Sequence, residues 1–285
     1  AATNLLTDSV FIAYRASKYN FLIYSIQSAV KLVLPAVLLM LGAYGIFAAS
    51  GLAAMLALIL SLFFLARVFG YRPQMHIHRS IIKQVWHFSS ASYAANLLNI
   101  IPTLVLPIVI VDQLGADDAG YYYLAFMLTN LVYAVAYSVS QSLFAEGSYG
   151  EVQFRQLLKR ASLLLTAIML PAAAGLALLG PLVLNLIGPS YGTHAAGVIV
   201  MLALAAPAVA ANVLGGISLR IVQRAGALIW TNAVYALVVC GLAFLWAPRG
   251  LAWIGGAWLV GNVVTAALEF ALAGYRIPKL RRRTA

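Results

Sequence analysis

The 59 residues between Arg160 and Arg220 include no Asp, Glu, Lys or Arg. About 20 consecutive apolar residues are enough to cross the roughly 30 Å hydrocarbon core of a bilayer as a helix. This run is long enough to cross, turn and cross back, with the turn at the Gly-Pro-Ser-Tyr-Gly sequence of residues 188–192. Because backbone polar groups inside the bilayer must be satisfied within the protein, the two crossings are predicted to be helices.

The composition of the whole chain is also that of a membrane protein. Hydrophobic residues make up 64% of the chain and charged residues 9%, compared with about 45–50% and about 25% in soluble domains. The net charge of +11 does not indicate a nucleic-acid partner, because the basic residues flank the apolar runs as they do in membrane proteins. With a single cysteine, Cys240, the chain has no disulfide framework, and we expect neither a metal site nor a cofactor.

Charge-free runs bounded by basic or turn residues predict eight crossings. They lie at about residues 20–41, 46–66, 84–111, 119–145, 161–187, 195–219, 227–246 and 251–273. With this assignment, 16 of the 18 basic residues fall on one side of the membrane, and the acidic loop 112–118 falls on the other. The positive-inside rule therefore predicts a multi-pass membrane protein with both ends of this chain in the cytoplasm.

Polar residues recur at helical spacing in the third and fourth spans. The third span carries Ser89, Ser92, Asn96, Asn99 and Thr103, and the fourth carries Asn130, Tyr133, Tyr137 and Gln141, all at steps of three or four. A polar side chain facing lipid is costly, so the two stripes are expected to turn away from the acyl chains. Consecutive helices joined by a short loop are neighbours, so the stripes could line one shared cavity. The alternative is that they hydrogen-bond between closely packed helices.

Two charged residues lie inside predicted spans. Lys31 falls about halfway along the first span, where it could face the cavity and meet an anionic group, or extend along the helix to the cytoplasmic surface. Glu269 lies two turns inside the last span, on a stripe with Asn262 and Thr265. It could be a protonatable coupling site, or it could reach the cytoplasmic surface or a salt bridge there.

Enzyme signatures are absent from the sequence, and we do not expect an enzyme. There is no His-Glu-x-x-His, no Gly-x-Ser-x-Gly and no P-loop motif. The outer connections are also too short for the long loop expected of a glycan polymerase.

Short motifs along the chain resemble the helix connections of one family. Residues 114–125, Leu-Gly-Ala-Asp-Asp-Ala-Gly-Tyr-Tyr-Tyr-Leu-Ala, resemble the connection between the seventh and eighth helices of polysaccharide transporters. Residues 13–19 resemble the connection before their fifth helix, residues 42–47 the turn between the fifth and sixth, and residues 186–196 the turn between the ninth and tenth. These transporters are the O-antigen and exopolysaccharide flippase-like members of the multidrug/oligosaccharidyl-lipid/polysaccharide exporter (MOP) superfamily.

This resemblance implies a fold of two six-helix bundles around a central cavity that opens alternately to the two sides of the membrane. Residues 1–78 would then hold the end of the first bundle, with two full transmembrane helices and an amphipathic lead-in, and residues 79–285 the whole second bundle. The first four helices of the family pattern are missing, and the chain opens on Ala-Ala-Thr-Asn rather than Met. We therefore expect an N-terminally truncated chain and a partial version of the fold.

The resemblance also implies a function and partners. The family is thought to move undecaprenyl-pyrophosphate-linked oligosaccharides across the cytoplasmic membrane, so we expect such a lipid-linked saccharide as substrate, membrane lipid around the protein, and glycan polymerases or glycosyltransferases as partners. Lys31 is the intramembrane cation that could match the basic cavity residues of some relatives. The sequence leaves three alternatives open: a cation-coupled, multidrug-type exporter, a membrane enzyme such as a polymerase or acyltransferase, and a non-transporting scaffold of a glycan-assembly complex.

Overall fold

The computed structural model describes residues 7–8, 10–11, 14, 16–38, 42–70, 79–147 and 151–274. In these ranges the regular secondary structure is entirely helical, and eight helices are long and apolar enough to span a membrane. The spanning helices coincide, within a few residues at each end, with the eight crossings predicted from the sequence, so the all-α polytopic fold class is confirmed. The chain divides into two compact units, residues 1–77 and 78–285.

The first unit is built on helices α2 (Ser17–Val37) and α3 (Gly42–Val68), which pack against each other. A small apolar core joins them to the residues that precede α2, and it includes Phe11, Ile23 and Leu65. Aromatic rings extend this core, because Tyr19 contacts both Phe11 and Phe64. Lys31 lies on α2 with its side chain exposed.

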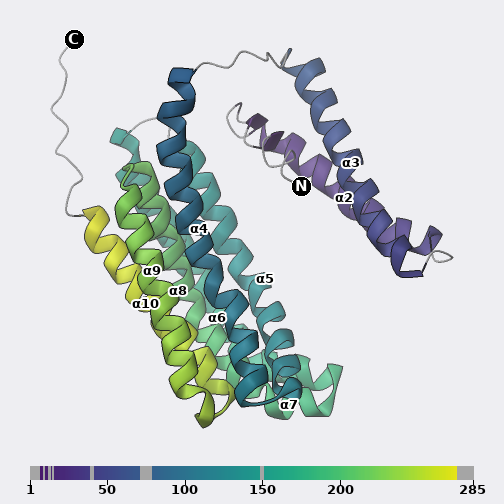
Figure 1. The fold of residues 1–285 in the computed structure, drawn as a ribbon, viewed down its shortest axis with the longest axis vertical. Coiled ribbons are helices and arrows are strands. Elements are labelled where there is room, and N and C mark those ends of the chain that lie inside the picture. Colours follow the sequence, from purple (N-terminus) through teal and green to yellow (C-terminus); the bar gives the residue numbers. More distant parts are fainter. Residues whose placement is uncertain are drawn as a thin grey trace. The chain divides into compact units, whose positions relative to one another are not determined.

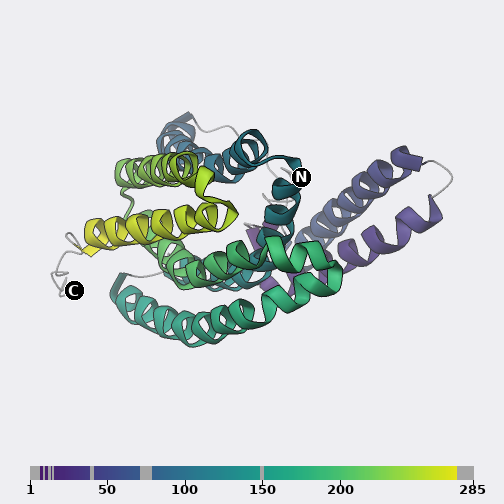
Figure 2. The ribbon, with the colours of Figure 1, turned by 90° about the horizontal axis from the view of Figure 1, so that it is seen from below.

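In the described part of the second unit, Figure 1 shows the long helices α4, α5, α6, α8, α9 and α10 and the short helix α7. Their bounds are α4 (Arg79–Gln113), α5 (Ala116–Gly147), α6 (Glu151–Ile187), α7 (Pro189–His194), α8 (Ala196–Ile221), α9 (Ala225–Trp246) and α10 (Leu251–Gly274). Successive long helices run in opposite directions, and the most extensive pairings are α8 with α10, α6 with α8, and α4 with α9. The end-on view of Figure 2 also shows α4 beside α9.

Two of the helix connections are tight because glycine adopts a left-handed backbone there. Gly115, between α4 and α5, has a φ of 107°, and Gly250, before α10, has a φ of 106°. Residues with a Cβ rarely adopt this conformation, whereas glycine does so at little cost. At the first turn, the N–H groups of Leu114 and Gly115 both donate to the carbonyl of Ile110, which closes the end of α4 as helix C-termini commonly are.

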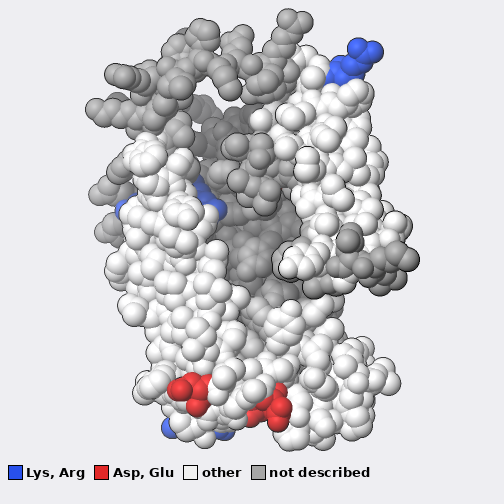
Figure 3. Space-filling model, turned by 45° about the vertical axis from the view of Figure 1, so that its right-hand side comes forward, with Lys and Arg blue, Asp and Glu red and all other residues white. Residues whose placement is uncertain are grey.

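Acidic and basic side chains of the second unit gather at opposite ends of its helices. Asp112, Asp117 and Asp118 lie around the α4–α5 turn, at what we call the acidic end, and Figure 3 shows acidic side chains together near one end of the surface. Arg249 lies at the same end, between α9 and α10. The opposite end, which we call the basic end, holds Lys159, Arg160, Arg220 and Arg224.

The half of the second unit nearer the acidic end is tightly packed. Its fully buried apolar side chains come from several helices and include Leu106 and Ile110 of α4, Leu202 of α8, and Ile254 of α10. Glycines allow close approach here, since a Cβ at Gly255 would lie 2.8 Å from the Cβ of Met201 on α8. Small residues at such contacts let membrane helices pack by van der Waals interaction.

Candidate functional site

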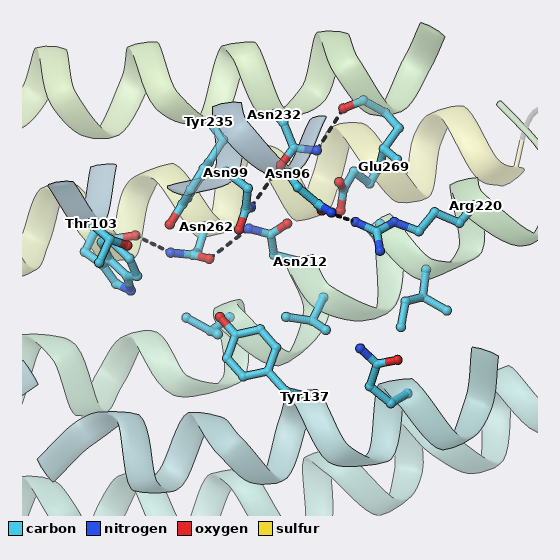
Figure 4. Close-up of a pocket in the computed structure, with 17 residues that line it drawn as sticks. Asn96, Asn99, Thr103, Tyr137, Asn212, Arg220, Asn232, Tyr235, Asn262 and Glu269 are labelled. Carbon is cyan, nitrogen blue, oxygen red and sulfur yellow. Dashed lines mark hydrogen bonds between the residues drawn. The ribbon is translucent and has the colours of Figure 1, made fainter. Parts of the chain in front are cut away.

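A polar cavity of about 240 Å³ lies among α4, α5, α8, α9 and α10, in the half of the second unit nearer the basic end (Figure 4). Amide side chains dominate its wall, together with aromatic rings, one arginine and one glutamate. The polar and aromatic lining residues are Asn96, Asn99, Thr103, Tyr137, Gln141, Asn212, Arg220, Asn232, Tyr235, Trp258, Asn262 and Glu269. Five helices of the same unit therefore contribute to one site.

Asparagines join α4 to α9 and to α8. The amide nitrogen of Asn99 donates a hydrogen bond of 2.9 Å to the Oδ1 of Asn232 on α9, and Asn232 in turn donates to the carbonyl of Leu228 at 2.8 Å. One turn earlier on α4, Asn96 accepts a 2.7 Å hydrogen bond from the guanidinium of Arg220. These hydrogen bonds orient the amide groups of Asn96 and Asn99 on the cavity wall.

A second pair of amides joins α8 to α10. Asn212 donates a 2.8 Å hydrogen bond to the Oδ1 of Asn262, whose own nitrogen donates to the carbonyl of Trp258 at 2.8 Å. Both asparagines are buried. The pair therefore satisfies polar groups that would otherwise be stranded in an apolar interface.

Glu269 is sealed into the α8–α10 interface and is only 1% exposed. The hydroxyl of Thr231 lies 3.3 Å from its Oε1, while its Oε2 has no hydrogen-bond partner within the described ranges. The carboxyl group fits because α8 carries two glycines at this level. A Cβ at Gly215 would lie 2.7 Å from both the Cβ and the Oε2 of Glu269, and one at Gly216 would lie 3.4 Å from Oε1.

Four of the eight residues predicted to line a substrate cavity do line this one: Asn96 and Asn99 of α4, and Tyr137 and Gln141 of α5. Thr103, which belongs to the same predicted stripe, lines it as well. In Figure 4, Tyr137 faces the asparagines from the opposite wall. Part of each stripe therefore lines the same cavity, although α4 packs more extensively against α9 than against α5.

The other four predicted lining residues lie elsewhere. Tyr133 is fully buried and donates a 2.7 Å hydrogen bond to the carbonyl of Leu202, so it connects α5 to α8. The amide of Asn130 donates to the carbonyl of Phe126 on its own helix. Ser92 lies one turn beyond Asn96, outside the cavity wall, and Lys31 belongs to the first unit.

The cavity residues of α8 and α9 were not predicted. Arg220 bounds the charge-free run from which two spans are predicted. Asn212 is a single Asn in an apolar run, and on α9 the polar signal is limited to Thr231, Asn232 and Tyr235, which is too short to mark a stripe along the helix. The stripe of Asn262 and Glu269 on α10 was recognised, and both residues line the cavity.

The sequence profile of the polysaccharide biosynthesis protein family matches residues 7–196. The chain belongs to this family. The match confirms the resemblance to polysaccharide transporters that the connection motifs indicate. No curated protein matches the chain significantly in sequence.

Solved structures of MOP-superfamily transporters share the fold. A crystal structure of MATE in complex with MaL6 superposes with a TM-score of 0.85 at 17% sequence identity, covering 96% of this chain and 66% of that one. An outward-facing multidrug resistance MATE transporter of the MOP superfamily gives a TM-score of 0.80 at 17% identity, with coverages of 96% and 66%.

A MOP-superfamily transporter from Pyrococcus furiosus, described by the reverse polarity of its binding pocket, gives 0.76 at 17% identity, with coverages of 92% and 63%. The chain thus spans about two thirds of the length of the transporters that share its fold.

Proposed function

We propose that the protein translocates a lipid-linked oligosaccharide or polysaccharide precursor across the cytoplasmic membrane by alternating access. The observation that carries the proposal is the amide-lined cavity, which lies inside a membrane-spanning bundle of a polysaccharide biosynthesis family member. Intramembrane polar groups are costly and are typically found where a substrate path needs them. This cavity has hydrogen-bonding groups for a hydrated passenger that could not dissolve in lipid.

The basic end of the second unit is proposed to face the cytoplasm, in accord with the positive-inside rule. The cavity then lies nearer the cytoplasmic side, which suits glycosyltransferases that assemble the precursor there as functional partners. In this orientation the sealed half of the unit faces the opposite side of the membrane.

The proposal is tested with the protein reconstituted in vesicles that carry a fluorescently labelled, lipid-linked saccharide in one leaflet. Replacing Asn96, Asn99 and Tyr137 together by Ala is expected to lower the initial rate of translocation by about 10-fold or more, equivalent to about 1.4 kcal/mol. The matched control is Asn130→Ala, since Asn130 bonds its own helix outside the cavity. Equal rates in the triple variant and the wild type, at equal protein content, would remove the cavity from the mechanism.

A cation-coupled small-molecule exporter is a second candidate, and Glu269 is the observation that favours it. The carboxyl group of Glu269 is buried inside a transporter fold, and one of its oxygens has no partner among the residues that the structure describes. The binding of a proton or cation to such a group could be linked to the conformation of the helices around it. Arg220, Tyr137 and Tyr235 are the other titratable residues of the cavity wall. In this case Glu269→Gln should abolish the dependence of export on pH or sodium. If the protein is a flippase that is not coupled at this site, Glu269→Gln should leave the pH and sodium dependence of translocation unchanged.

A further inference from the structure

The hydrogen-bonding groups that remain unused in the cavity are of both kinds. Asn96 accepts from Arg220 but its amide nitrogen, a donor, has no partner among the described residues. Asn99 and Asn212 donate through their nitrogens, so the Oδ1 atom of each remains an acceptor without a described donor. An amide presents a donor and an acceptor side by side, and the cavity thus presents a mixed pattern.

This mixed pattern differs from what a bare ion requires. A phosphate or other anion needs converging donors, and here only Arg220 is cationic while the free oxygens of Asn99 and Asn212 would repel the anion. A metal cation needs converging oxygens, but the guanidinium of Arg220 and the free amide nitrogen of Asn96 line the same cavity as the carboxyl group of Glu269, so the wall as a whole presents no set of converging oxygens. A hydroxyl group donates and accepts at once, so a polyol can use both kinds of group on this wall.

An aromatic ring completes the arrangement opposite the amides. Tyr137 of α5 is 44% exposed, and it faces the asparagine wall across the cavity (Figure 4). The face of an aromatic ring carries partial negative charge, which suits the C–H groups on the apolar face of a sugar ring. One wall can thus bind hydroxyls while the other covers the ring.

The size of the cavity limits its occupant. Pockets for drug-sized ligands measure about 300–1,000 Å³, and this cavity, at about 240 Å³, falls below that range. A cavity of this size is suited to one sugar ring at a time.

We propose that this cavity is a monosaccharide-binding compartment that recognises one neutral sugar unit of the passenger through Asn96, Asn99 and Asn212 on one wall and the ring of Tyr137 on the other. The proposal rests on the proposed function, and it specifies that the second unit binds the glycan rather than the lipid phosphate. Sugar selectivity would then depend on the asparagine wall.

The test uses the purified protein in lipid nanodiscs and the fluorescence of Trp258, whose side chain lines the cavity. Glucose, galactose, N-acetylglucosamine, glucuronate and inorganic pyrophosphate are titrated separately, and the signal of Trp258 is obtained by difference from Trp258→Phe. At least one neutral sugar should give a saturable change, with a Kd around 1 mM or weaker because a single sugar makes few contacts.

Two substitutions of Tyr137 separate the loss of sugar binding from a loss of folding, because the side chain is exposed and neither substitution removes a packed core residue. Tyr137→Phe retains the ring and should bind the sugar within about 3-fold of wild type, whereas Tyr137→Leu should weaken binding by about 10-fold or more, because only the second removes the stacking surface. Asn99→Leu should also weaken binding about 10-fold, while Asn130→Leu, outside the cavity, should leave it unchanged.

Three results would overturn the proposal: no neutral sugar alters the Trp258 signal, pyrophosphate alters it while sugars do not, or Tyr137→Leu binds sugar as well as wild type does. The vesicle assay separates this outcome from failure of the proposed function. Sugar binding without translocation would contradict flipping alone, and translocation that is unaffected in Tyr137→Leu, with no sugar binding, would contradict the monosaccharide compartment alone.

Discussion

The side chain of Glu269 occupies space that exists only because position 215 carries no side chain. A methyl group at Gly215 would lie 2.7 Å from two atoms of Glu269, well inside van der Waals contact. The carboxyl side chain on α10 and the two glycines on α8 therefore fit together, because a larger residue at position 215 would occupy the space of the Glu269 side chain.

This dependence predicts that Gly215→Ala destabilises the protein by about 1–3 kcal/mol, the usual cost of forcing an extra methyl group into a packed interior. The measurement is thermal or denaturant unfolding in detergent. Gly175→Ala on α6 is the matched control, because a Cβ there would contact nothing within 4 Å, and alanine favours a helix over glycine by up to about 1 kcal/mol. Equal stability of the two variants would contradict the structural role given to Gly215.

The buried pair of Asn212 and Asn262 leads to a second prediction at this scale. Replacing either residue by Leu leaves a buried amide group of the other without its hydrogen-bond partner. Replacing both by Leu removes both amide groups, so neither is left unpaired. A double-mutant cycle of unfolding free energies should give a coupling of about 0.6 kcal/mol, and at most about 1.7, as in other membrane helix pairs. Additive single effects would show that the bond contributes nothing to stability.

At the scale of helices, the hydrogen bond from Tyr133 to the carbonyl of Leu202 connects α5 to α8. Tyr133 and Tyr137 lie one turn apart on the same stripe, yet Tyr133 is fully buried and bonded to Leu202 whereas Tyr137 is 44% exposed. The difference arises because the half of the unit nearer the acidic end is closed by packing and the other half holds the cavity. Tyrosine is thus a buried packing residue at position 133 and a cavity-lining residue one turn later, at position 137.

Tyr133→Phe should accordingly lower the free energy of unfolding by about 1 kcal/mol, since it removes a buried hydrogen bond without changing the ring. Translocation by the folded fraction should be unchanged, because Tyr133 is outside the cavity wall. Tyr123→Phe on the same helix serves as control, because Tyr123 is 67% exposed. A loss of translocation without a loss of stability would place Tyr133 in the substrate path instead.

The helices themselves could be predicted from sequence, because a charge-free apolar run long enough to cross a membrane has few other solutions. Helical spacing also identified which faces of α4 and α5 carry Asn99 and Tyr137. Spacing along one helix does not reveal the level at which a cavity begins, so it does not separate Asn130 and Tyr133, which lie outside this cavity, from Asn99 and Tyr137, which line it. It also does not reveal partners 133 residues apart, such as Asn99 and Asn232, which meet only once the helices have packed.

At the scale of the whole molecule, the distribution of charge predicts the orientation of the second unit. In a Cys240→Ala background, Lys159→Cys should react with a membrane-impermeant thiol reagent only from the cytoplasmic side, and Asp117→Cys only from the other. Both positions are exposed and lie at opposite ends of the unit. The reverse labelling pattern would contradict the orientation that the positive-inside rule predicts.

The tightly packed half of the second unit has a consequence for ion leakage. An ion that reached Asn99 from the basic end would next meet Leu106, Leu202 and Ile254, which are fully buried and offer nothing to replace its hydration shell. Carrying charge through such a region costs several kcal/mol or more. The packed half of the second unit therefore opposes the passage of ions from the cavity to the acidic end, even though the cavity itself is polar.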